Sequence, residues 1–324
     1  MRHISTLIVG AGQCGLAMSH ALGQYGVDHL ILERGQVANS WRTERWNSLT
    51  LLTPNWANSF PGFQKNGLDA DGFLKASEFA DRLDIAATNN KAPIQTETSV
   101  EHITRTNGRY IVETTSGPIS CDSLVAANGA CRAPNISEFC GDIPANIQQF
   151  TPHSYKRPAD LPAGRVLVVG ASASGLQLAL EIQMSDRQVT LTIGNHLRLP
   201  RSYRGSDILK WMEIIGATTV PYTDVDDIER VRRTPSLPLS GSPSTQIDLN
   251  ALQNIGVEIV GRLATNRDGW ALSSGELAKL CAAADLKMNR LLATIDDWIG
   301  ADGLEPLFPE RECPTPTRCP ETPD

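Results

Sequence analysis

The chain has 324 residues, of which 41% are hydrophobic and 20% charged, with a formal net charge of −7. This length is too great for one small core and favours two lobes. An acidic chain without an evident basic face disfavours nucleic acid as a partner. No apolar run approaches the roughly 20 residues that cross a bilayer, and the first apolar strand begins near Ile4, too early for a signal peptide. We therefore expect a cytoplasmic protein that does not bind membranes.

The first motif is a strand that breaks into a glycine turn. Ile4–Val9 is continuously apolar and β-rich, which is typical of a buried parallel strand. In the following GAGQCG, Gly10 permits a tight turn, Gly12 lets a pyrophosphate approach the backbone, and Gly15 lets a helix pack closely on the strand. The helix predicted over Leu16–Tyr25 aims its N-terminus, with its dipole and free N–H groups, at the phosphates.

A second strand completes this unit. His29–Leu32 ends at Glu33, about 20 residues past the glycines, where an acid binds ribose hydroxyls. The glycine pattern alone is a weak signal, but strand, turn, helix, strand and acid in register predict a dinucleotide site. The plainer alternative is a glycine-rich turn in a βαβ unit that holds no ligand.

A similar turn returns in the middle of the chain. The predicted strand Arg165–Val169 leads into GASASG, followed by a predicted helix over Leu176–Met184. Serine stands where the middle glycine would be, and it is small enough for close approach while its hydroxyl can bond a phosphate. The candidate cofactor-binding residues of this turn are Gly170, Ser172, Ser174 and Gly175.

The end of the next strand predicts which nucleotide binds there. Gln188–Ile193 ends at Gly194, not at an acid, and Arg198 and Arg201 follow. Without a carboxylate a 2′-phosphate is not repelled, and a nearby arginine can pair with it, which favours NADPH over NADH. The alternative is that these arginines form an ordinary solvated loop. Two dinucleotide sites of different character suggest an electron relay, with resident FAD on the first turn.

Cysteine and metal chemistry are not indicated by the sequence. The seven cysteines are an odd number, lack a Cys-x-x-Cys motif and lack metal-ligand spacing, although Cys313 and Cys319 lie in a proline-rich tail where they could oxidise. A Ser/His/Asp set and paired carboxylates are missing as well, so an enzyme of this sequence relies on a cofactor.

These motifs resemble a known family. The sequence is similar to the bacterial flavin-containing monooxygenase-like flavoproteins, which are related to the flavin monooxygenases and Baeyer–Villiger enzymes. The likeness covers about residues 4–300 and rests on GAGQCGLA, LERG, SWRTERWNSLTLLTPNWANSFPG, DADGF, HSYKRPADLPAGRVLVVGASASG, RLPRSYRGSDI and GVEIVGRL. It implies a bound FAD, a second domain for NADPH, and dioxygen captured by reduced flavin as a C4a-(hydro)peroxide that oxidises a small-molecule substrate.

The resemblance also implies roles for further residues. Trp41 and Arg42 match the region beside the flavin, although Trp41 has the alternative reading of a core aromatic. The LERG motif adds Arg34 to the cofactor-binding candidates, and Ser123–Gly129, a predicted strand that leads to a tight turn, adds Asn128 and Gly129. The candidate catalytic residues are Asn55, beside the flavin's reactive face, and His153 in the linker, for which a bland surface turn is the alternative.

Two departures from the family concern the catalytic asparagine and the C-terminus. The family's asparagine aligns near Leu52, so Asn55 is a substitute. The family's final return to the FAD domain is replaced by EPLFPERECPTPTRCPETPD, which reads as extended or disordered. The loss of that closing segment predicts weaker flavin retention, or completion of the FAD domain by homo-oligomerisation or a second chain.

The sequence thus predicts an α/β protein with two Rossmann-like dinucleotide-binding domains, FAD-binding 1–155 and NAD(P)H-binding 156–300, and a proline-rich tail 301–324. The leading function is an NADPH-dependent FAD oxidoreductase of monooxygenase type. The alternatives are a flavin oxidase or reductase without oxygen insertion, and a non-catalytic nucleotide-binding subunit. Substrate and oligomeric state are left open.

Overall fold

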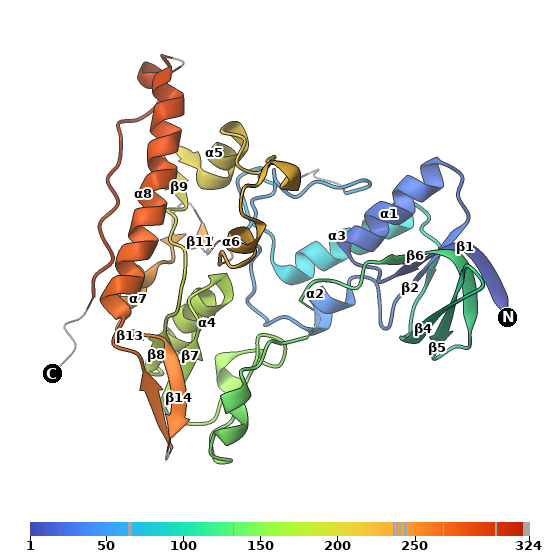
Figure 1. Cartoon of the computed structure of the whole chain (residues 1–324), viewed down its shortest axis with the longest axis horizontal. Helices are drawn as coiled ribbons and strands as arrows, with labels where there is room; N and C mark the ends of the chain where they lie inside the picture. Colours follow the sequence, from blue (N-terminus) through green and yellow to red (C-terminus); the bar gives the residue numbers. More distant parts are fainter. Residues whose placement is uncertain are drawn as a thin grey trace. The chain divides into compact units, whose positions relative to one another are not determined.

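The computed structural model forms two compact units. It describes residues 1–63, 67–131, 133–235, 237, 239, 241–242, 245–267, 269–301 and 303–319. The first unit comprises residues 1–136 and 149–160, and the second comprises residues 137–148 and 161–324 (Figure 1). The boundary predicted at residue 155 lies within the segment 149–160 of the first unit.

The first unit is built on a mixed six-stranded sheet of order β3-β2-β1-β6-β5-β4. The central strand β1 pairs in parallel with β2 and β6, while β5 and β4 continue the sheet in antiparallel fashion. Parallel neighbours on both sides bury most of β1, which is why the strand ends in the apolar run Leu7–Val9. The strands are β1 (Arg2–Val9), β2 (His29–Leu32), β3 (Ile94–Gln95), β4 (Val100–Thr106), β5 (Arg109–Thr114) and β6 (Ile119–Ala126).

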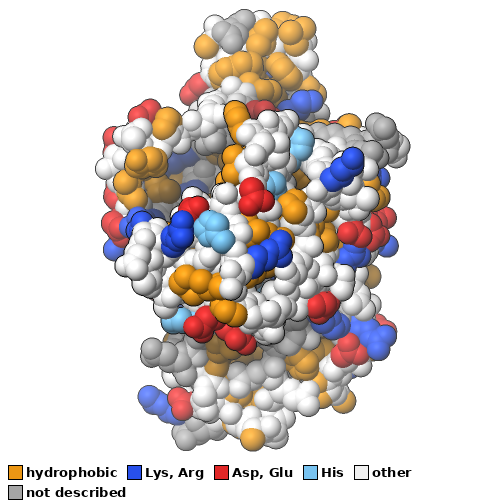
Figure 2. All heavy atoms as spheres, turned by 90° about the vertical axis from the view of Figure 1, so that its right-hand side faces the viewer, with side chains coloured by type: hydrophobic (Ala, Val, Ile, Leu, Met, Phe, Trp, Pro, Cys, Tyr) orange, Lys and Arg blue, Asp and Glu red, His pale blue; other side chains and the backbone are white. Residues whose placement is uncertain are grey.

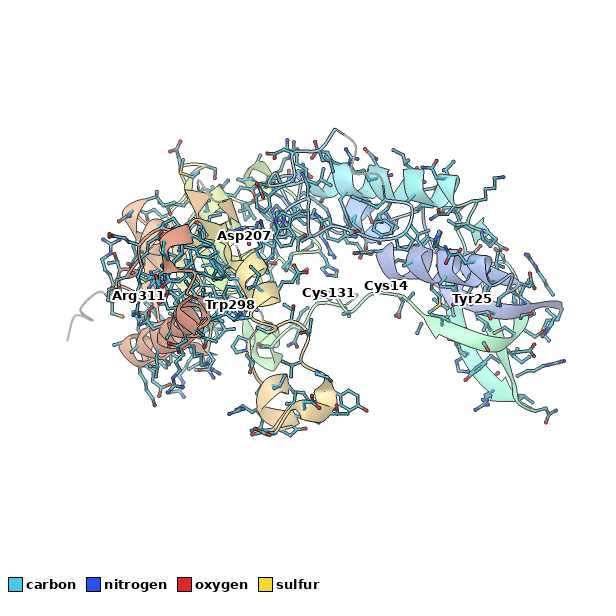
Figure 3. All side chains as sticks on the ribbon, turned by 90° about the horizontal axis from the view of Figure 1, so that it is seen from above. Cys14, Tyr25, Cys131, Asp207, Trp298 and Arg311 are labelled. Carbon is cyan, nitrogen blue, oxygen red and sulfur yellow. The ribbon has the colours of Figure 1, made fainter. Side chains whose placement is uncertain are left out.

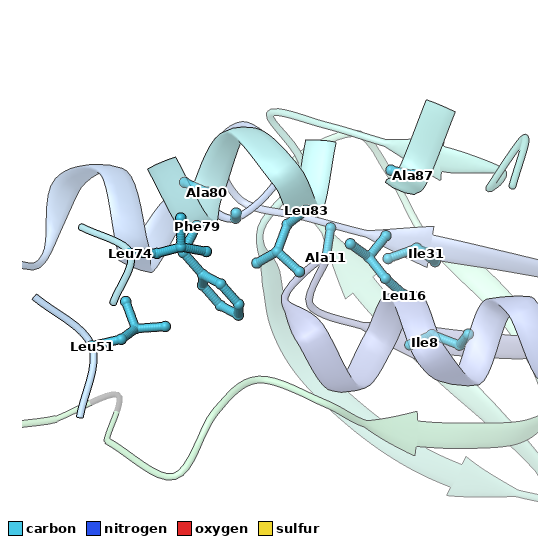
Figure 4. Close-up of a cluster of buried hydrophobic side chains, with 11 residues drawn as sticks. Ile8, Ala11, Leu16, Ile31, Leu51, Leu74, Phe79, Ala80, Leu83 and Ala87 are labelled. Carbon is cyan, nitrogen blue, oxygen red and sulfur yellow. The ribbon is translucent and has the colours of Figure 1, made fainter. Parts of the chain in front are cut away.

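Helices α1 (Gln13–Gln24) and α3 (Ala76–Asn89) pack on one face of this sheet. Because side chains alternate along a strand, Ile8 and Ile31 point to this face, where they meet Leu16 of α1 and the apolar stripe of α3 (Figure 4). A separate cluster that includes Leu7, Leu30, Leu32, Val112 and Ile119 fills the opposite face. A short helix, α2 (Asn39–Thr43), follows β2.

The second unit has a smaller parallel sheet of order β13-β8-β7. Its strands are β7 (Val166–Val169), β8 (Val189–Thr192) and β13 (Glu258–Val260), and α4 (Ala173–Gln183) connects β7 to β8. The α/β fold with a glycine turn after the first strand of each parallel array is therefore as predicted. The remaining elements are η1 (Glu138–Asp142), η2 (Pro158–Asp160), β9 (Ser202–Tyr203), β10 (Ser206–Asp207), α5 (Ile208–Ile214), η3 (Tyr222–Asp224), α6 (Ile228–Arg232), β11 (Gly241–Ser242), β12 (Thr245–Gln246), α7 (Leu249–Asn254), β14 (Leu263–Arg267) and β15 (Trp270–Ser273).

A long amphipathic helix, α8 (Leu277–Ala301), closes the second unit. Its buried residues recur every three or four positions, so they form one stripe facing the unit's core. They are Leu277, Leu280, Cys281, Ala284, Met288, Leu292, Ile295 and Ile299.

Residues 303–319, here called the C-terminal strap, run beside α8 (Figure 1). The sequence left extended and disordered states open, and the structure has an extended chain with one short turn, η4 (Glu305–Leu307). Phe308 packs on Trp211 of α5 with ring centroids 5.0 Å apart, and Arg311 pairs with Asp296 of α8 at 3.0 Å. Figure 3 labels Arg311 on the strap and Trp298 on α8. Specific contacts thus replace the regular hydrogen bonding that the prolines prevent.

The surface drawn in Figure 2 carries charges of both signs. Lysine and arginine side chains lie among aspartates and glutamates on this face, so it lacks the single-sign field that attracts a polyanion. Within the described part of the chain, no helix combines the length and the apolar character that a membrane span requires.

Candidate functional site

The first glycine turn lies between β1 and α1, and each of its glycines meets a different steric condition. Gly10 has φ +108°, and a Cβ there would lie 2.6 Å from Ala127 O. A Cβ on Gly15 would lie 1.9 Å from Gly10 O, so only glycine lets α1 approach the turn this closely. At Gly12 a Cβ would meet no atom of the described residues within 4 Å, which makes this the side from which a ligand can approach.

The N-terminus of α1 is free to bind an anion. The N-cap residue Gly12 has an extended backbone. Among the described residues, no side chain caps the first-turn N–H groups, and the first turn contains no acidic residue. Uncapped N–H groups and the positive end of the helix dipole together favour a phosphate at this position.

Glu33 borders the same turn, as the sequence predicted. Its side chain is buried, Oε2 accepts from Ala11 N at 2.8 Å, and Oε1 accepts from Gly35 N at 3.2 Å. These bonds fix the carboxylate at the rim of the turn, and each oxygen keeps a lone pair for a ribose hydroxyl. The neighbouring Arg34 points elsewhere, into an ion pair with Glu44.

The turn after β6 completes this edge of the first unit. Ala127 N donates to Val9 O at 2.9 Å, which places residues 127–129 beside the glycine turn. Asn128 is exposed, and Gly129 has φ +84°, a left-handed conformation that favours glycine. The structure therefore brings together four predicted positions that are far apart in the sequence, namely Gly10, Glu33, Asn128 and Gly129.

Two other candidates of the first unit have partners within it. Trp41 meets Phe79 edge-on, with centroids 5.0 Å apart, and carries the Arg45 guanidinium 5.3 Å above its ring. Arg42 pairs with Asp81 of α3 at 2.7 Å. Trp41 thus packs against the core as an aromatic, and Arg42 forms an exposed ion pair.

Asn55 is held rigidly but keeps one orphaned atom. It is 5% exposed, its amide Nδ2 donates to Asp69 O at 2.8 Å, and its backbone N donates to Gly72 O at 2.9 Å. Its Oδ1 is buried without a hydrogen-bond partner among the described residues. A buried acceptor of this kind costs free energy unless a donor reaches it, so it is a candidate ligand contact.

Lys156 is a residue that sequence reasoning missed. Its Nζ donates to Thr43 O at 2.6 Å, to Arg45 O at 3.1 Å and to His153 O at 3.1 Å. The ammonium thereby caps the carbonyl end of α2, where a cation is favoured, and fixes the half-buried His153 in its turn. The local sequence gave no signal, because two of the three carbonyls, those of Thr43 and Arg45, are far from Lys156 along the chain.

The second glycine turn repeats the first. Gly170 has φ +103° and donates to Thr192 O at 2.9 Å, and a Cβ on Gly175 would lie 1.8 Å from Gly170 O. Ser172 is the exposed N-cap of α4, and within the described residues it forms no side-chain cap bond, while Ser174 lies in the helix's first turn. The backbone at this turn therefore presents the same anion-binding groups as the first turn.

The arginines that follow β8 are buried in ion pairs, so they do not form a solvated loop. Arg198 is 7% exposed and pairs with Asp285 at 2.7 Å and Asp248 at 3.1 Å, and Arg201, at 2%, pairs with Asp207 at 2.7 Å. Both guanidinium groups neutralise carboxylates inside their own unit. Loop sequences do not reveal such burial, because the partner carboxylates lie on other elements.

A small pocket opens beside the second turn. It is lined by Ala171, Leu176, His196, Leu197, Arg198, Leu199, Ile247, Asp248 and Leu249. His196 bonds Gly194 O through Nδ1 at 3.0 Å, and its buried Nε2 has no partner among the described residues. Burial lowers the pKa of His196, so the neutral ring offers Nε2 as an acceptor in the pocket.

Arg262 is a second residue that sequence reasoning did not assign. Its guanidinium lies beside Gly194, where a Cβ would be 3.5 Å from Nε and Nη2. The side chain is exposed, and it forms no ion pair or hydrogen bond with a described residue. Arg262 follows β13, and the parallel pairing of β13 with β8 brings it to the end of β8. The GVEIVGRL motif contains it, but only the strand pairing reveals its position.

Over the ranges that the structure describes, no group of three His, Cys, Asp or Glu side chains could hold a metal ion.

Comparison with known proteins agrees with this geometry. The pyridine nucleotide-disulphide oxidoreductase family matches residues 7–213, a stretch that contains both glycine turns. The chain belongs to this family. Within it, the chain is 33% identical over 223 residues to an uncharacterized CzcO-like oxidoreductase of Geobacillus kaustophilus, covering 68% of this chain and 63% of the relative. It is also 28% identical to the indole-3-pyruvate monooxygenase YUCCA6 of Arabidopsis thaliana, covering 64% of this chain and 54% of that protein.

Solved structures of other proteins share the fold. A flavin-containing monooxygenase from Stenotrophomonas maltophilia superimposes with a TM-score of 0.62 at 19% identity, over 85% of this chain and 75% of that one. A bacillithiol disulfide reductase from Staphylococcus aureus gives 0.56 at 17% identity, over 81% and 67%. The predicted resemblance to flavin monooxygenase-like FAD/NAD(P)-binding proteins is confirmed by these relatives. The chain spans just under two thirds of the length of the CzcO-like relative.

The close approach of α1 to its turn predicts a large effect of Gly15→Ala. The added methyl would overlap Gly10 O, so the helix must shift, and we expect a loss of about 1–3 kcal/mol in the free energy of unfolding. The matched control is Gly23→Ala in the same helix, where a Cβ meets no described atom within 4 Å and stability should rise by up to about 1 kcal/mol. Denaturant unfolding measures both, and equal effects of the two substitutions would contradict the packing argument.

The buried His196 predicts a pH dependence of stability. Its folded-state pKa lies below the unfolded value of about 6.5, so acidification protonates the unfolded chain first and favours unfolding. The contribution is present above pH 6.5 and is lost as the pH falls below it. In His196→Asn the amide can still donate to Gly194 O but does not titrate. Between pH 7.5 and 5.5 we expect wild type to lose stability relative to this variant, by at most about 1.4 kcal/mol per pH unit. A pH-independent difference would contradict the assignment.

Proposed function

We propose that the protein is an NADPH-dependent FAD oxidoreductase of monooxygenase type, acting on a small organic substrate with dioxygen. The observation that carries the proposal is the repetition, in two units of one chain, of a glycine turn that leads directly into a helix, and in both helices the N-cap residue forms no side-chain cap bond with a described residue. One such turn accommodates one dinucleotide, and two allow electrons to pass from a diffusing donor to a resident acceptor.

The first unit has the features that FAD requires. The open side of Gly12 and the N-terminus of α1 suit the pyrophosphate, and Glu33 stands where a ribose hydroxyl is bound. Bound flavin supplies hydride acceptance and oxygen activation. The protein's part is to hold and shield the ring. The orphaned Oδ1 of Asn55, fixed in direction by bonds to Asp69 and Gly72, supports a role for Asn55 as an acceptor for a ring or substrate N–H.

The second unit has the features that NADPH requires. Ser172 and the N-terminus of α4 suit the pyrophosphate, and Nε2 of His196 offers an acceptor in the adjoining pocket. We assign recognition of the 2′-phosphate to Arg262, because its exposed guanidinium lies beside Gly194, where an acid would select NAD instead. Arg198 and Arg201 then serve the fold of the loop, through their ion pairs with Asp248, Asp285 and Asp207.

The flavin monooxygenase reading is favoured over the oxidase reading by the relatives. YUCCA6 is named as a monooxygenase of indole-3-pyruvate, and the Stenotrophomonas protein as a flavin-containing monooxygenase. The reductase named for bacillithiol disulfide superimposes less closely, and it shares the fold at 17% identity.

The reaction class is tested by following flavin, NADPH and oxygen together. Purified protein saturated with FAD should show the flavin's visible band, NADPH should bleach that band without oxygen, and air should restore it. With a thioether, a tertiary amine or indole-3-pyruvate as trial substrates, isotopically labelled dioxygen should place its label in the product. If label appears only in hydrogen peroxide with every trial substrate, the oxidase alternative replaces this proposal, and if NADPH never bleaches the flavin, a non-catalytic subunit does.

The assignment of Arg262 is tested by Arg262→Ala. Loss of a charge-assisted bond to phosphate, about 1.5–3 kcal/mol, should raise the Kd for NADPH about 10- to 100-fold and leave that for NADH nearly unchanged. Arg290→Ala on α8 is the control, since Arg290 is also exposed in the same unit and should change neither value. Equal weakening of both nucleotides by Arg262→Ala would refute selective recognition of the 2′-phosphate.

A further inference from the structure

The C-terminal strap runs antiparallel to α8. Arg311 pairs with Asp296 at 3.0 Å, and Thr317 donates to Asp285 through its backbone N at 2.8 Å and its hydroxyl at 2.9 Å. As the strap advances from 311 to 317, its partners on the helix therefore recede from 296 to 285. Six extended residues span about 20 Å, and eleven helical residues span about 16 Å, so the two segments run side by side over this length.

The strap is also bound to α7. Arg318 donates from its backbone N to Asn250 Oδ1 at 2.9 Å and from Nη2 to Asn254 Oδ1 at 2.6 Å. In return Asn250 Nδ2 donates to Pro316 O at 3.0 Å, and Gln253 Nε2 donates to Arg318 O at 3.0 Å. The chain just before Cys319 is thus fixed from two sides, and Cys319 has little freedom in where it lies.

The register of these contacts brings two cysteines together. Cys319 follows Thr317 by two extended residues, about 7 Å, and Cys281 precedes Asp285 by one helical turn, about 6 Å. The two thiols consequently lie near each other, close enough for Cys319 to raise the pKa of the Cys281 thiol, while Cys319 Sγ donates to Thr317 O at 3.9 Å. Cys281 is 2% exposed on the buried stripe of α8, whereas Cys319 is partly exposed, and both are free thiols. The contacts of Arg311, Thr317 and Arg318 set this register without the thiols, so the juxtaposition does not depend on the cysteines alone.

We propose that Cys281 and Cys319 form a redox-modification site, a reversible disulfide that fastens the C-terminal strap to α8. The oxidant is hydrogen peroxide. The more accessible Cys319 reacts first as its thiolate: its sulfur attacks one peroxide oxygen, the O–O bond breaks, and hydroxide leaves, giving a sulfenic acid. The sulfur of Cys281 then attacks that of Cys319, forming the S–S bond and expelling hydroxide, which takes up the Cys281 proton as water. In sum, two thiols and one peroxide give one disulfide and two waters, and two electrons pass from sulfur to oxygen.

The different surroundings of the two thiols assign these roles. Burial, with a smaller contribution from the neighbouring thiol, raises the pKa of Cys281 to about 12, so Cys281 is not the thiolate that meets peroxide. Once Cys319 is oxidised, the backbone contacts of Thr317 and Arg318 keep its sulfur near that of Cys281 for the second step. A dithiol reductant reverses the reaction by thiol–disulfide exchange.

The disulfide would act on the pocket beside the second glycine turn. Asp285 accepts from the strap's Thr317 and also pairs with Arg198, which lines that pocket. Fastening the strap at position 319 therefore holds Thr317 on Asp285 and fixes the buried Arg198. The oxidised protein should also resist unfolding of the second unit, because the bond closes a long loop in the unfolded chain.

Peptide mapping of the whole protein tests the proposal directly. The protein is treated with hydrogen peroxide, its remaining thiols are alkylated, and it is digested with trypsin without reduction. Cleavage after lysine and arginine places Cys281 in the peptide 280–287, Cys319 in 319–324 and Cys313 in 312–318. We expect a linked 280–287/319–324 pair that disappears after a dithiol reductant. The same treatment should raise the midpoint of thermal unfolding of the second unit by about 5–10 °C.

The variants make the outcome decisive. Cys319→Ser removes a partly exposed thiol and should abolish both the linked peptide and the thermal shift, whereas Cys313→Ser, the control on the same strap, should keep both. In Cys281→Ala, Cys319 should remain as a sulfenic acid that a dimedone probe labels. If wild type gives no 280–287/319–324 pair under peroxide, or if 319–324 links to 312–318 instead, the proposal is overturned. These measurements need no flavin or NADPH, so they are independent of the proposed function.

Discussion

One steric constraint governs both nucleotide sites, namely the contact between the first turn of a helix and the carbonyl of the glycine that ends the preceding strand. A Cβ would come within 1.9 Å of that oxygen at Gly15 and within 1.8 Å at Gly175. Because the third glycine of each turn lacks a side chain, each helix starts directly on its sheet, and its free N–H groups converge on one point. In the first unit, the packing of α3 on β1 and β2 holds this arrangement in place. In the second unit, the pairing of β8 with β13 does so.

Buried charge organises the second unit. Arg198, Arg201 and Arg204 recur at every third position, and each meets carboxylates from other elements, with Arg204 bound to Asp296 at 3.1 Å and to Glu305 of the strap. A buried ion pair is a weak source of stability but a strong constraint, because removal of one partner leaves an uncompensated charge. The strap therefore belongs to the electrostatic structure of this unit, and its chemical state bears on the pocket that Arg198 lines.

The candidate site could be predicted from the sequence wherever it is formed by the backbone of a glycine turn. Glu33 was predictable because a βαβ unit of this length brings the end of β2 beside the turn, and its bond to Ala11 N agrees. Side chains that depend on distant partners were not predictable in this way. The arginines after β8 lie where a phosphate-binding arginine was expected, yet their carboxylate partners come from β10, the N-cap of α7, and α8. Arg262 is exposed, and the pairing of β13 with β8 brings it beside Gly194 at the end of β8.

The sequence by itself determined the two glycine turns, the strands and helices around them, and the α/β class, since these follow from local backbone freedom and from apolar periodicity along the chain. Only the tertiary structure decided which side chains are free to act. Burial left Oδ1 of Asn55 and Nε2 of His196 without partners among the described residues, and an antiparallel contact between strap and helix brought Cys281 to Cys319. The physical reason is that a conformation of a few residues depends on neighbours in sequence, whereas burial, charge pairing and thiol contact depend on segments that meet only when the chain has folded.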